Sequence, residues 1–447
     1  MEKQDLVIVG AGTAGAVAAA EAARKGLRVC LVDLKKRELI GEKVCGDAIA
    51  KHHFDNLSMQ YPSGDELEGR VDGMRVFSPD RETSLRILGE GMSGFTINRQ
   101  RFGQRLLKKA LDAGATLLDQ TRVIGPLIQD GFVRGIEAKQ EGSEGKVEIP
   151  ASVTVDASGC VGAIRSRLPP SFGVESDIKN EDMIVAYREI RSDVAWSSNL
   201  GEIYLTMQLA PGGYYWIFDK GNGKINIGLG VQMTGKHPNP KEQLYKHVLS
   251  HPIFRKSKME QGGGGIVPTR RPIYSLVSDG ILIAGDAACL VNPIHGGGIG
   301  PSMLSGRLAA QVAVEALEKG DVSKEALWQY NIRYMQSYGA KQAGLDIFRL
   351  FLQNISDDEL NFGMKNRLVK EEDVLRTSMT GNLQLSIIDK AGRALKAMAR
   401  PGFLMKLEKT ATKMREIKAL YQRYPAPSDF ERWKHSVASI YESLVGQ

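Results

Sequence analysis

The sequence predicts an α/β protein with a split parallel-sheet domain, an inserted antiparallel β-sheet and a helical C-terminal region. Two strand–turn–helix patterns far apart in the chain, at 5–33 and 281–318, indicate a sheet that the chain leaves and re-enters. Between them, residues 183–232 alternate apolar and polar side chains in short runs, which is typical of antiparallel strands. Beyond about residue 340 the pattern is mostly helical.

The first strand–turn–helix pattern spans Asp5–Asp33, DLVIVGAGTAGAVAAAEAARKGLRVCLVD. Gly10 permits the tight turn after the strand, Gly12 lets the backbone approach a pyrophosphate, and Gly15 lets the helix pack on the strand. The helix N-terminus would face the phosphates with its free N–H groups. Asp33 ends the second strand, 18 residues past Gly15, where an acid binds an adenosine ribose hydroxyl. This βαβ unit predicts a Rossmann-type dinucleotide-binding site.

Bulk properties describe a soluble globular chain with two or three domains. The chain has 447 residues, of which 25% are charged and 42% hydrophobic. It has no apolar run of roughly 18 residues and no signal-peptide pattern at its start. We therefore expect a cytoplasmic protein, or one held peripherally on the inner membrane face. Four cysteines without metal-ligand spacing predict no metal site, and we expect no nucleic-acid partner.

The remaining elements suggest how the domains are divided. Asn98 begins a predicted helix that ends near Gly114, and strands follow at 115–118, 121–128 and 133–138. The nucleotide-domain signals and the β-rich segment alternate along the chain, so the binding domain is expected to be split. The predicted boundaries are 1–70, 95–170 and 270–345 for the nucleotide-binding domain, 71–94 and 171–269 for the substrate-binding β-sheet domain, and 346–447 for the helical domain.

A second glycine-rich signal, at Gly285-Asp286, indicates which dinucleotide is bound. It ends an apolar strand and precedes a helix expected at Ile299–Glu318. A nicotinamide dehydrogenase has no use for an acid here, whereas the ribitol of an extended FAD needs a hydrogen-bond acceptor such as Asp286. The segment Pro293–Gly300 has few side chains and can press against a flavin edge, where the helix dipole favours negative charge. We therefore expect FAD.

These motifs resemble those of the para-hydroxybenzoate-hydroxylase-type flavoproteins and, within them, the archaeal geranylgeranyl reductase (digeranylgeranylglycerophospholipid reductase) family. The most specific match is Pro211–Phe218, which is similar to a PxxYxWxFP motif that lines the isoprenoid cavity, with Asp219 in place of the last proline. The other matching stretches are the N-terminal glycine motif, Lys43–Asp47, Asn98-Arg99 with Phe102 and Leu106, Asp156–Gly159, and Gly285-Asp286 with the glycines that follow.

The resemblance implies an FAD-dependent reductase that saturates isolated C=C bonds of geranylgeranyl chains in archaeal membrane-lipid synthesis. The polyprenyl substrate is geranylgeranyl diphosphate, digeranylgeranylglyceryl phospholipid or both. The implied FAD contacts are Gly10, Gly12, Ala14, Gly15, Asp33, Lys43, Cys45, Gly46, Arg99, Val123, Asp156, Gly159, Gly285, Asp286, Gly297, Gly298 and Ile299. The implied substrate contacts are Tyr214, Tyr215, Trp216, Phe218, His52 and Gly296. The implied catalytic residues are Cys45, Gly46, Asp47, Tyr215 and His295.

By the same resemblance, hydride passes from N5 of the reduced flavin to one alkene carbon and a proton to the other. The alkene is unactivated, so protonation must supply much of the activation and water must be kept away. The candidate proton donors are Cys45, Tyr215, His295 or a held water. A purely structural role for Cys45, or a redox pair of Cys45 with Cys289, stays open. His52 and His53 fit a helix surface better than acid–base chemistry.

Other interpretations share parts of this pattern. A flavin monooxygenase or halogenase has most of the cofactor signals, but Asp156–Gly159 lacks the hydroxylase Asp-Gly pair and Tyr214–Phe218 fits the halogenase WxWxIP pattern poorly. A non-catalytic prenyl-chain carrier of the GDP-dissociation-inhibitor type is disfavoured by the intact Gly285-Asp286. The aromatic string could also be ordinary strand core. No second GxGxxG unit occurs, so the external electron donor, NADPH or a ferredoxin-like protein, stays open.

A basic stretch in the C-terminal region suggests contact with an anionic surface. Residues Arg393–Arg423 carry nine Lys or Arg against two Glu, an excess of +7 that equals the net charge of the whole chain. The interleaved apolar residues are Leu395, Met398, Phe403, Leu404, Met405 and Leu407. The stretch could contact a membrane surface, bind a polyanionic ligand, or pack as a lid with its charges solvated.

Overall fold

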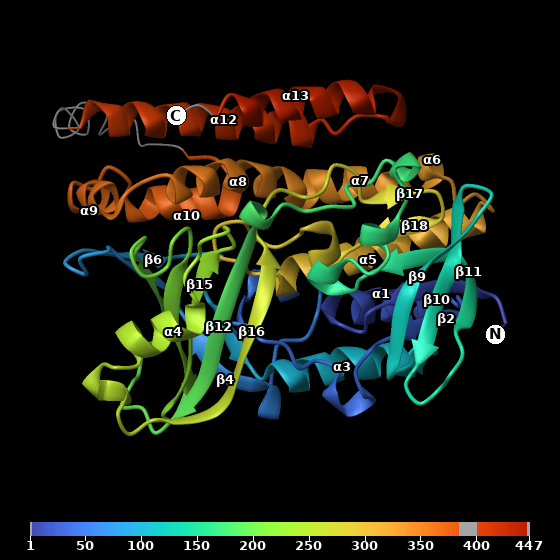
Figure 1. Cartoon of the computed structure of the whole chain (residues 1–447), viewed down its shortest axis with the longest axis horizontal. Coiled ribbons are helices and arrows are strands. Elements are labelled where there is room, and N and C mark those ends of the chain that lie inside the picture. Colours follow the sequence, from blue (N-terminus) through green and yellow to red (C-terminus); the bar gives the residue numbers. More distant parts are fainter. Residues whose placement is uncertain (1, 384–399, 445–447) are drawn as a thin grey trace.

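A mainly parallel β-sheet forms one half of the molecule in this computed structural model, which describes residues 2–383 and 400–444 (Figure 1). Its strand order is β17–β18–β11–β1–β2–β8, and β10 and β9 extend it as antiparallel strands beside β11. Their bounds are β1 Gln4–Val9, β2 Val29–Val32, β8 Thr116–Leu118, β9 Thr121–Gln129, β10 Phe132–Gln140, β11 Val147–Asp156, β17 Val277–Ser278 and β18 Ile281–Ile283. The chain leaves this sheet after β11 and returns at β17, so the predicted split is confirmed.

A layer of three helices packs against this sheet. α1 (Thr13–Arg24) packs between α3 (Arg99–Asp112) and α5 (Ile299–Glu318). The Asn98 side chain accepts a hydrogen bond from the N–H of Arg101, which caps α3 where the sequence predicts its start. A Cβ at Gly306 would lie 2.2 Å from the carbonyl oxygen of Ala14, so only glycine allows α5 to approach α1 this closely.

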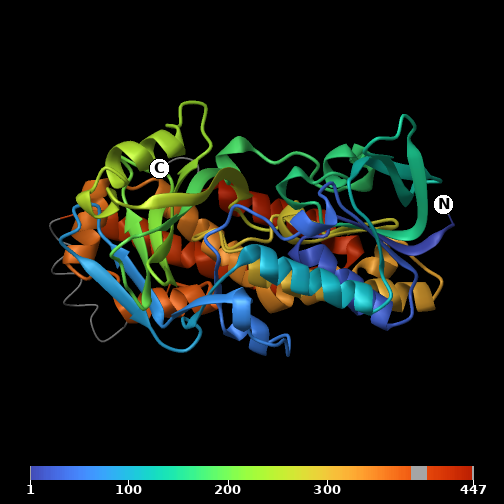
Figure 2. The ribbon, with the colours of Figure 1, turned by 90° about the horizontal axis from the view of Figure 1, so that it is seen from below.

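A second, mostly antiparallel sheet lies beside the first along the long axis of the molecule (Figure 2). Its order is β16–β12–β15–β14–β13–β5–β6, with β13 and β5 parallel. The strands are β5 Gly73–Phe77, β6 Ser84–Leu88, β12 Met183–Ser192, β13 Leu200–Leu205, β14 Tyr214–Gly221, β15 Lys224–Gln232 and β16 Lys258–Pro268. The short α4 (Pro240–Gln243) packs against β12 and β15. Segments 71–94 and 171–269 thus share one sheet.

A small third sheet connects the two larger sheets. It has the order β3–β7–β4, and its strands are β3 Ala48–Ala50, β4 Leu67–Val71 and β7 Gly94–Ile97. The Thr96 hydroxyl donates to the carbonyl of Asp219 in β14, at 2.9 Å. The short helix α2 (His52–Asp55) follows β3 directly, which places it between the sheets and α5.

The C-terminal region is helical, as predicted, and lies along one side of the molecule (Figure 1). Helix α7 continues through a π-helical turn, Met335–Gly339, into α8 without a break. The helices are α6 Lys324–Leu327, α7 Gln329–Tyr334, α8 Ala340–Gln353, α9 Asp357–Lys365, α10 Glu371–Thr380, α12 Pro401–Gln422 and α13 Phe430–Glu442. α12 packs on α8 and α13 on α12.

Buried ion pairs connect the C-terminal helices to the rest of the chain. Arg349 on α8 donates to Asp182 at 3.0 Å and to Asp346 at 2.8 Å. Glu175 lies between Arg270 and Arg271, with its nearer oxygen 2.9 Å from Arg270. Burial raises the pKa of Glu175, but the two guanidinium groups outweigh burial and lower it to about 2. The network therefore depends on an ionised carboxylate.

Candidate functional site

The first glycine motif, Gly10–Gly15, forms a tightly packed turn at one end of a large cavity in the molecule. Gly10 has a φ of +96°, and a Cβ there would lie 2.6 Å from the carbonyl oxygen of Ala157. A Cβ at Gly15 would lie 1.9 Å from the carbonyl oxygen of Gly10, whereas a Cβ at Gly12 would meet nothing within 4 Å. Gly10 and Gly15 thus allow the close packing, and Gly12 leaves open space where a pyrophosphate can approach.

Asp33 is fixed beside this turn. One carboxylate oxygen accepts a hydrogen bond from the N–H of Ala11 at 2.7 Å, and the other accepts from the N–H of Lys35 at 2.8 Å. Each oxygen keeps a free lone pair, and Asp33 lines the cavity. It is therefore oriented to accept hydrogen bonds from a ribose.

The hydrogen bonds of Arg99 indicate whether a diphosphate fits at this end of the cavity. Its side chain is 8% exposed and donates from Nη2 to the Thr13 hydroxyl at 2.6 Å. Its Nε and Nη1 atoms are buried and have no partner among the described residues. Arg99 and Thr13 both line the cavity next to Gly12. A buried cation with two unused donors fits a diphosphate, and Arg99 would hold the pyrophosphate of FAD there.

Asp286 marks the other end of the cofactor site. The Lys43 ammonium donates to its carboxylate at 2.6 Å, and Asp286 raises the pKa of Lys43 against the opposing effect of burial. A Cβ at Gly298 would lie 3.1 Å from the same carboxylate. The N-terminus of α5 follows at Ile299. Gly296, Gly297, Gly298 and Ile299 all line the cavity, as does Gly285. These residues fit the ribitol and flavin end of FAD.

The Cys45-Gly46-Asp47 turn is held by residues of the inserted sheet. The carbonyl of Cys45 accepts hydrogen bonds from Asn226 at 2.8 Å and Arg188 at 3.1 Å. The Asp47 carboxylate accepts from Lys220 at 2.8 Å and from Asn226 at 2.9 Å. Asp47 is 2% exposed and has a φ of +59°. One carboxylate oxygen is thus committed to shaping the turn, whereas the other has no partner among the described residues and Asp47 lines the cavity, so a catalytic Asp47 stays a prediction.

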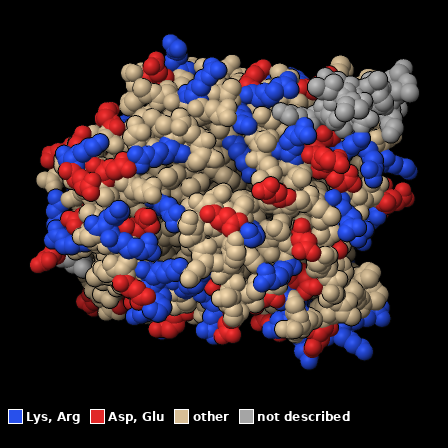
Figure 3. Space-filling model, turned by 180° about the vertical axis from the view of Figure 1, so that it is seen from behind, with Lys and Arg blue, Asp and Glu red and all other residues tan. Residues whose placement is uncertain are grey.

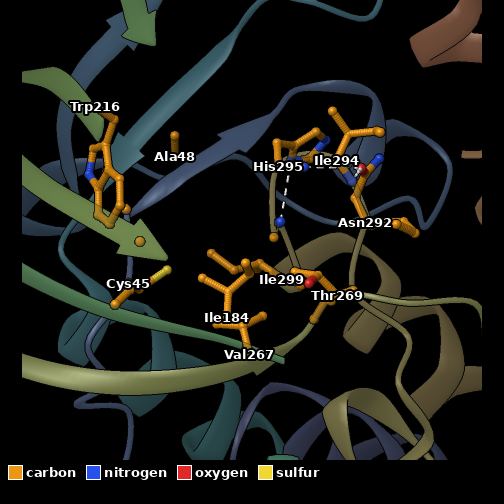
Figure 4. Close-up of a pocket in the computed structure, with 18 of the residues that line it drawn as sticks. Cys45, Ala48, Ile184, Trp216, Val267, Thr269, Asn292, Ile294, His295 and Ile299 are labelled. Carbon is orange, nitrogen blue, oxygen red and sulfur yellow. Dashed lines mark hydrogen bonds between the residues drawn. The ribbon is translucent and has the colours of Figure 1, made fainter. Parts of the chain in front are cut away.

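Cys45 itself faces the cavity. Its sulfur accepts a hydrogen bond from the N–H of Asp47 at 3.3 Å, and Gly46 also lines the cavity. In Figure 4, Cys45 and Trp216 lie on one side of the pocket, opposite His295, Asn292 and Thr269. All four cysteines of the chain are free thiols, and Cys289 is buried outside the cavity lining. No disulfide joins Cys45 to Cys289.

The aromatic string of β14 divides between two faces of the sheet. Tyr214, Trp216 and Phe218 line the cavity, because side chains alternate along a strand. Tyr215 points to the opposite face, where its ring stacks on that of Tyr204 with centroids 4.3 Å apart. Tyr215 is thus core, which corrects its expected catalytic and substrate contacts. The Tyr214 hydroxyl donates to the carbonyl of His295 at 2.8 Å, which links the aromatic wall to the glycine segment.

Three predicted cofactor residues, Gly15, Asp156 and Val123, do not line the cavity. The Asp156 carboxylate is fully buried and accepts hydrogen bonds from the N–H groups of Ser158, Ile164 and Arg165. It therefore shapes the turn that places Gly159, which lines the cavity, rather than contacting a ligand. Val123 lies in β9 and packs against the main core. Ala14 and Lys43 line the cavity, as expected.

One continuous cavity of about 1080 Å³ contains these groups. From the cofactor end it continues between the third sheet, the inserted sheet and the C-terminal helices. Its far walls are apolar and include Met74, Ile87, Phe95, Phe351, Met364 and Phe403. Local sequence patterns do not indicate that Phe351, Met364 and Phe403 line a cavity, because only the fold brings these helices to it.

Burial disfavours the charged form of the cavity histidines. His52 and His53 both line the cavity, which agrees with the implied substrate contact of His52 and corrects the placement of both residues on a helix surface. Burial lowers the pKa of both rings and lowers that of His295 to about 4, and the charge of Lys341 adds to each effect. A neutral imidazole is a weak proton donor, so His295 is a poor candidate for the acid of the reaction.

The basic stretch is only partly described, since 384–399, with Arg393, Leu395 and Met398, lies outside the described residues. In α12, Phe403 and Leu407 are buried and line the cavity, whereas Met405 is 65% exposed. Figure 3 shows basic and acidic side chains interspersed over one face of the molecule. Among the described residues, no helix is long and apolar enough to span a bilayer. Nor do they contain a group of three potential metal ligands.

The fold and the site define a class: an FAD-dependent oxidoreductase whose cofactor site opens into an apolar cavity. The model of the FAD dependent oxidoreductase family matches residues 5–200, and that of the geranylgeranyl reductase catalytic domain matches 182–267. A digeranylgeranylglycerophospholipid reductase of Sulfolobus acidocaldarius is 42% identical over 443 residues, 98% of this chain and 97% of that protein. One of Methanothrix thermoacetophila is 33% identical and covers 86% of this chain and 95% of its own. The chain belongs to the digeranylgeranylglycerophospholipid reductase family.

Solved structures agree with this assignment. A geranylgeranyl bacteriochlorophyll reductase-like protein of Thermoplasma acidophilum superposes with a TM-score of 0.77 at 25% identity, covering 92% of this chain and all of that one. A flavin-dependent brominase reaches a TM-score of 0.65 at 17% identity, over 90% of this chain and 99% of its own, a likeness that shows the fold alone. The predicted family and the FAD cofactor are confirmed.

Proposed function

We propose that this protein saturates the isolated C=C bonds of geranylgeranyl chains carried on phosphorylated precursors of archaeal membrane lipids. The observation that carries the proposal is the single cavity, which joins the FAD-binding groups to an apolar, aromatic-walled space. A halogenase or hydroxylase of small aromatic substrates has no use for a space of this length and apolarity. The family's named members act on such prenyl lipids, which supports the same substrate class.

Different residues would bind the prenyl chain, exclude water and supply the proton. When bound and reduced by two electrons, FAD would supply the hydride for one alkene carbon. Tyr214, Trp216 and Phe218 hold the flexible chain against a rigid wall and keep water away from the reacting bond. The Cys45 thiol donates the proton to the other alkene carbon and regains one from solvent. Its sulfur is positioned by the turn that Asn226 holds.

Cys45 is the best-placed acid among the predicted donors. Tyr215 faces the other side of the sheet, and His295 is neutral in its buried setting. The Tyr214 hydroxyl already donates a hydrogen bond to the carbonyl of His295, and burial raises the pKa of Tyr214. The Cys45 sulfur accepts one hydrogen bond and donates none within the described residues, so its proton is free to point into the cavity.

The proposal is tested by product analysis under anaerobic conditions. Dithionite-reduced, FAD-loaded protein is incubated with geranylgeranyl diphosphate or with digeranylgeranylglyceryl phosphate, and the products are analysed by mass spectrometry. We expect the mass of a hydrogen molecule to be gained for each saturated bond. Unchanged substrates, together with oxygenated or halogenated products in air, would instead assign the chain to the monooxygenase or halogenase class.

The proposal also covers the partners. We propose that the prenyl lipid is taken from a membrane surface by peripheral contact in the cytoplasm, and that NADPH or a ferredoxin-like protein reduces the flavin. The support for surface contact is the substrate class together with the exposed Lys409, Arg415 and Arg423 of the basic stretch. Following flavin bleaching with each donor in turn, with and without anionic liposomes, tests both points.

A further inference from the structure

A buried charged cluster connects the turn that carries Cys45 to solvent. We call Asp47, Lys220, Glu68 and Arg188 the Asp47 cluster. The Lys220 ammonium lies 2.8 Å from Oδ2 of Asp47 and 2.5 Å from Oε2 of Glu68. The Arg188 guanidinium lies 3.9 Å from the same Asp47 oxygen. These side chains are at most 3% exposed, except that of Glu68, which is 24% exposed. Glu68 is therefore the member of the cluster that meets water.

A β-bulge places Lys220 in this cluster. Trp216 and Phe218 lie on the cavity face of β14, and alternation along the strand puts Lys220 on the same side. The pairing of β14 with β15 shifts register between Asp219 and Gly221, the two neighbours of Lys220. Bulges redirect side chains beside active sites. Lys220 is thus buried at the end of the aromatic wall and does not line the cavity itself.

Asp47 connects Lys220 to the cavity. Lys220 also donates to the carbonyl of Ile97 at 3.0 Å, so three acceptors, one for each N–H, surround its ammonium. Asp47 lines the cavity, and its Oδ1 atom is buried without a hydrogen-bond partner in residues 2–383 and 400–444. The backbone N–H of Asp47 donates to the Cys45 sulfur at 3.3 Å. Asp47 therefore offers an unused carboxylate oxygen in the part of the cavity wall that carries Cys45.

The Asp47 cluster can move a proton internally without a change in its net charge. It contains two carboxylates and two cations, and a proton passed from Lys220 to Asp47 removes one charge of each sign. Burying a net charge is costly, and a transfer within a neutral cluster avoids that cost. Arg188 keeps its proton, as guanidinium groups in proteins do, and its hydrogen bond to the carbonyl of Cys45 holds the turn in place.

The proposed reaction needs a supply of protons that does not pass through the occupied cavity. Each saturated bond takes one proton from the Cys45 thiol and leaves a thiolate. The polyprenyl chain that fills the cavity keeps water away from the reacting groups. A geranylgeranyl chain has several double bonds, so the thiol has to be restored repeatedly. A route behind the cavity wall would supply these protons.

We propose that Glu68, Lys220 and Asp47 form a proton path from solvent to the cavity thiol. This inference rests on the proposed function, because it assigns the source of the proton that Cys45 donates. The Lys220 ammonium passes a proton to the Asp47 carboxylate, and Asp47 passes it to the thiolate, which re-forms the S–H bond. The Lys220 amine then regains a proton that Glu68 takes from water. The net change is one proton drawn from solvent for each bond saturated, and no electrons move along the path.

Alkene reduction in two regimes tests this path, with FAD-loaded protein and geranylgeranyl diphosphate in the absence of oxygen. In a single turnover of pre-reduced protein, the proton already on Cys45 is sufficient, whereas each further turnover with excess dithionite needs a new proton. Wild type, Glu68→Gln, Lys220→Arg and Glu260→Gln are compared in H2O and in D2O. Arginine keeps the charge of Lys220 but does not release its proton. Glu260→Gln is the matched control, since its carboxylate pairs with Lys224 at 2.8 Å on the surface of the inserted sheet. FAD absorbance and melting temperature verify folding.

We expect Glu68→Gln and Lys220→Arg to keep the single-turnover rate within about threefold of wild type but to lower the multiple-turnover rate about 10- to 100-fold. Their multiple-turnover rates should also fall further in D2O than that of wild type, because proton transfer becomes limiting. Glu260→Gln should match wild type in both regimes.

An unchanged multiple-turnover rate in Glu68→Gln would overturn the inference and indicate that protons enter through the open cavity. Equal losses in both regimes would overturn it as well, since they indicate a purely structural cluster. So would full multiple-turnover activity in Lys220→Arg, because that variant preserves only the charge. If Lys220→Arg fails to fold, the two rates of Glu68→Gln decide. Wild type that reduces no alkene in either regime would instead overturn the proposed function itself.

Discussion

Replacing Arg99 with methionine should weaken FAD binding without destabilising the FAD-free protein. Arg99 is 8% exposed, and its Nε and Nη1 atoms have no partner among the described residues. A buried cation without its anion carries a desolvation cost, which methionine removes from the FAD-free state. Methionine also keeps an apolar stem near Phe102, whose ring centroid lies 5.5 Å from the guanidinium carbon. The substitution should therefore weaken FAD binding, whereas the stability of the FAD-free protein should stay the same or rise.

The expected size follows from the hydrogen bonds that the guanidinium can offer. Among the described residues, the guanidinium uses only its Nη2 donor, on Thr13, so Nε and Nη1 are available for phosphate oxygens. A hydrogen bond to a charged group contributes about 1.5–3 kcal/mol. The loss of one such bond weakens binding about 10- to 150-fold, and the loss of a second adds to this.

The assay is a titration of FAD-free protein with FAD, followed by flavin fluorescence, together with urea unfolding of the FAD-free protein. Arg101→Met is the matched control, because Arg101 is an exposed residue of the same helix and loses the same charge. An affinity within threefold of the control would refute the assignment of Arg99 to the pyrophosphate. A free energy of unfolding more than about 1 kcal/mol below the control would refute the claim that its charge is uncompensated.

Three further perturbations test other parts of the site. Cys45→Ser should keep its FAD and melting temperature but slow alkene reduction about 100-fold or more in single-turnover assays, and an unchanged rate would remove Cys45 as the acid. Trp216→Ala should alter the distribution of partially reduced products, whereas Ile217→Ala, on the other face of the strand, should not; equal effects would contradict the proposed wall. The pKa of Glu175 is depressed to about 2 from an ordinary 4.5 by the Arg270-Arg271 pair, so its stabilising effect is present above pH 4.5 and lost as the pH falls towards 2. Melting temperatures of Glu175→Gln and wild type should converge over that range, and a constant difference would contradict the ion-pair argument.

The sequence predicted the parts of the fold that local patterns determine. The βαβ unit, the cap at Asn98 and the bounds Ile299–Glu318 of α5 are present as expected. Each of these features is determined by residues that lie close together in the sequence, through glycine spacing, capping chemistry or apolar periodicity. The return of the chain to the first sheet was also predictable, because Gly285-Asp286 ends a strand that reads as buried on both faces.

The errors at the site arise from side-chain direction and from tertiary contacts. Alternation alone places Tyr214 and Tyr215 on opposite faces, but it does not indicate which face meets the cavity. Asp156 ends β11 and Asp286 follows shortly after β18, yet the oxygens of Asp156 are taken up by backbone N–H groups of the following turn. Asn226 was overlooked because its role depends on partners from other elements of the fold. The sequence did contain one signal for Asn226, because it is a polar residue within an otherwise apolar strand.

Helix α12 shows why the basic stretch supported two interpretations at once. Its buried residues include Phe403 and Leu407, which complete the cavity wall, so this inward face acts as the lid. Its outward face carries exposed cations, and Met405 is the large apolar side chain that remains exposed on it. Such a face can be attracted to anionic lipid, weakly in salt, but offers little apolar surface for insertion. The packing of the inward face on the cavity and the proposed surface contact of the outward face are therefore compatible on one helix.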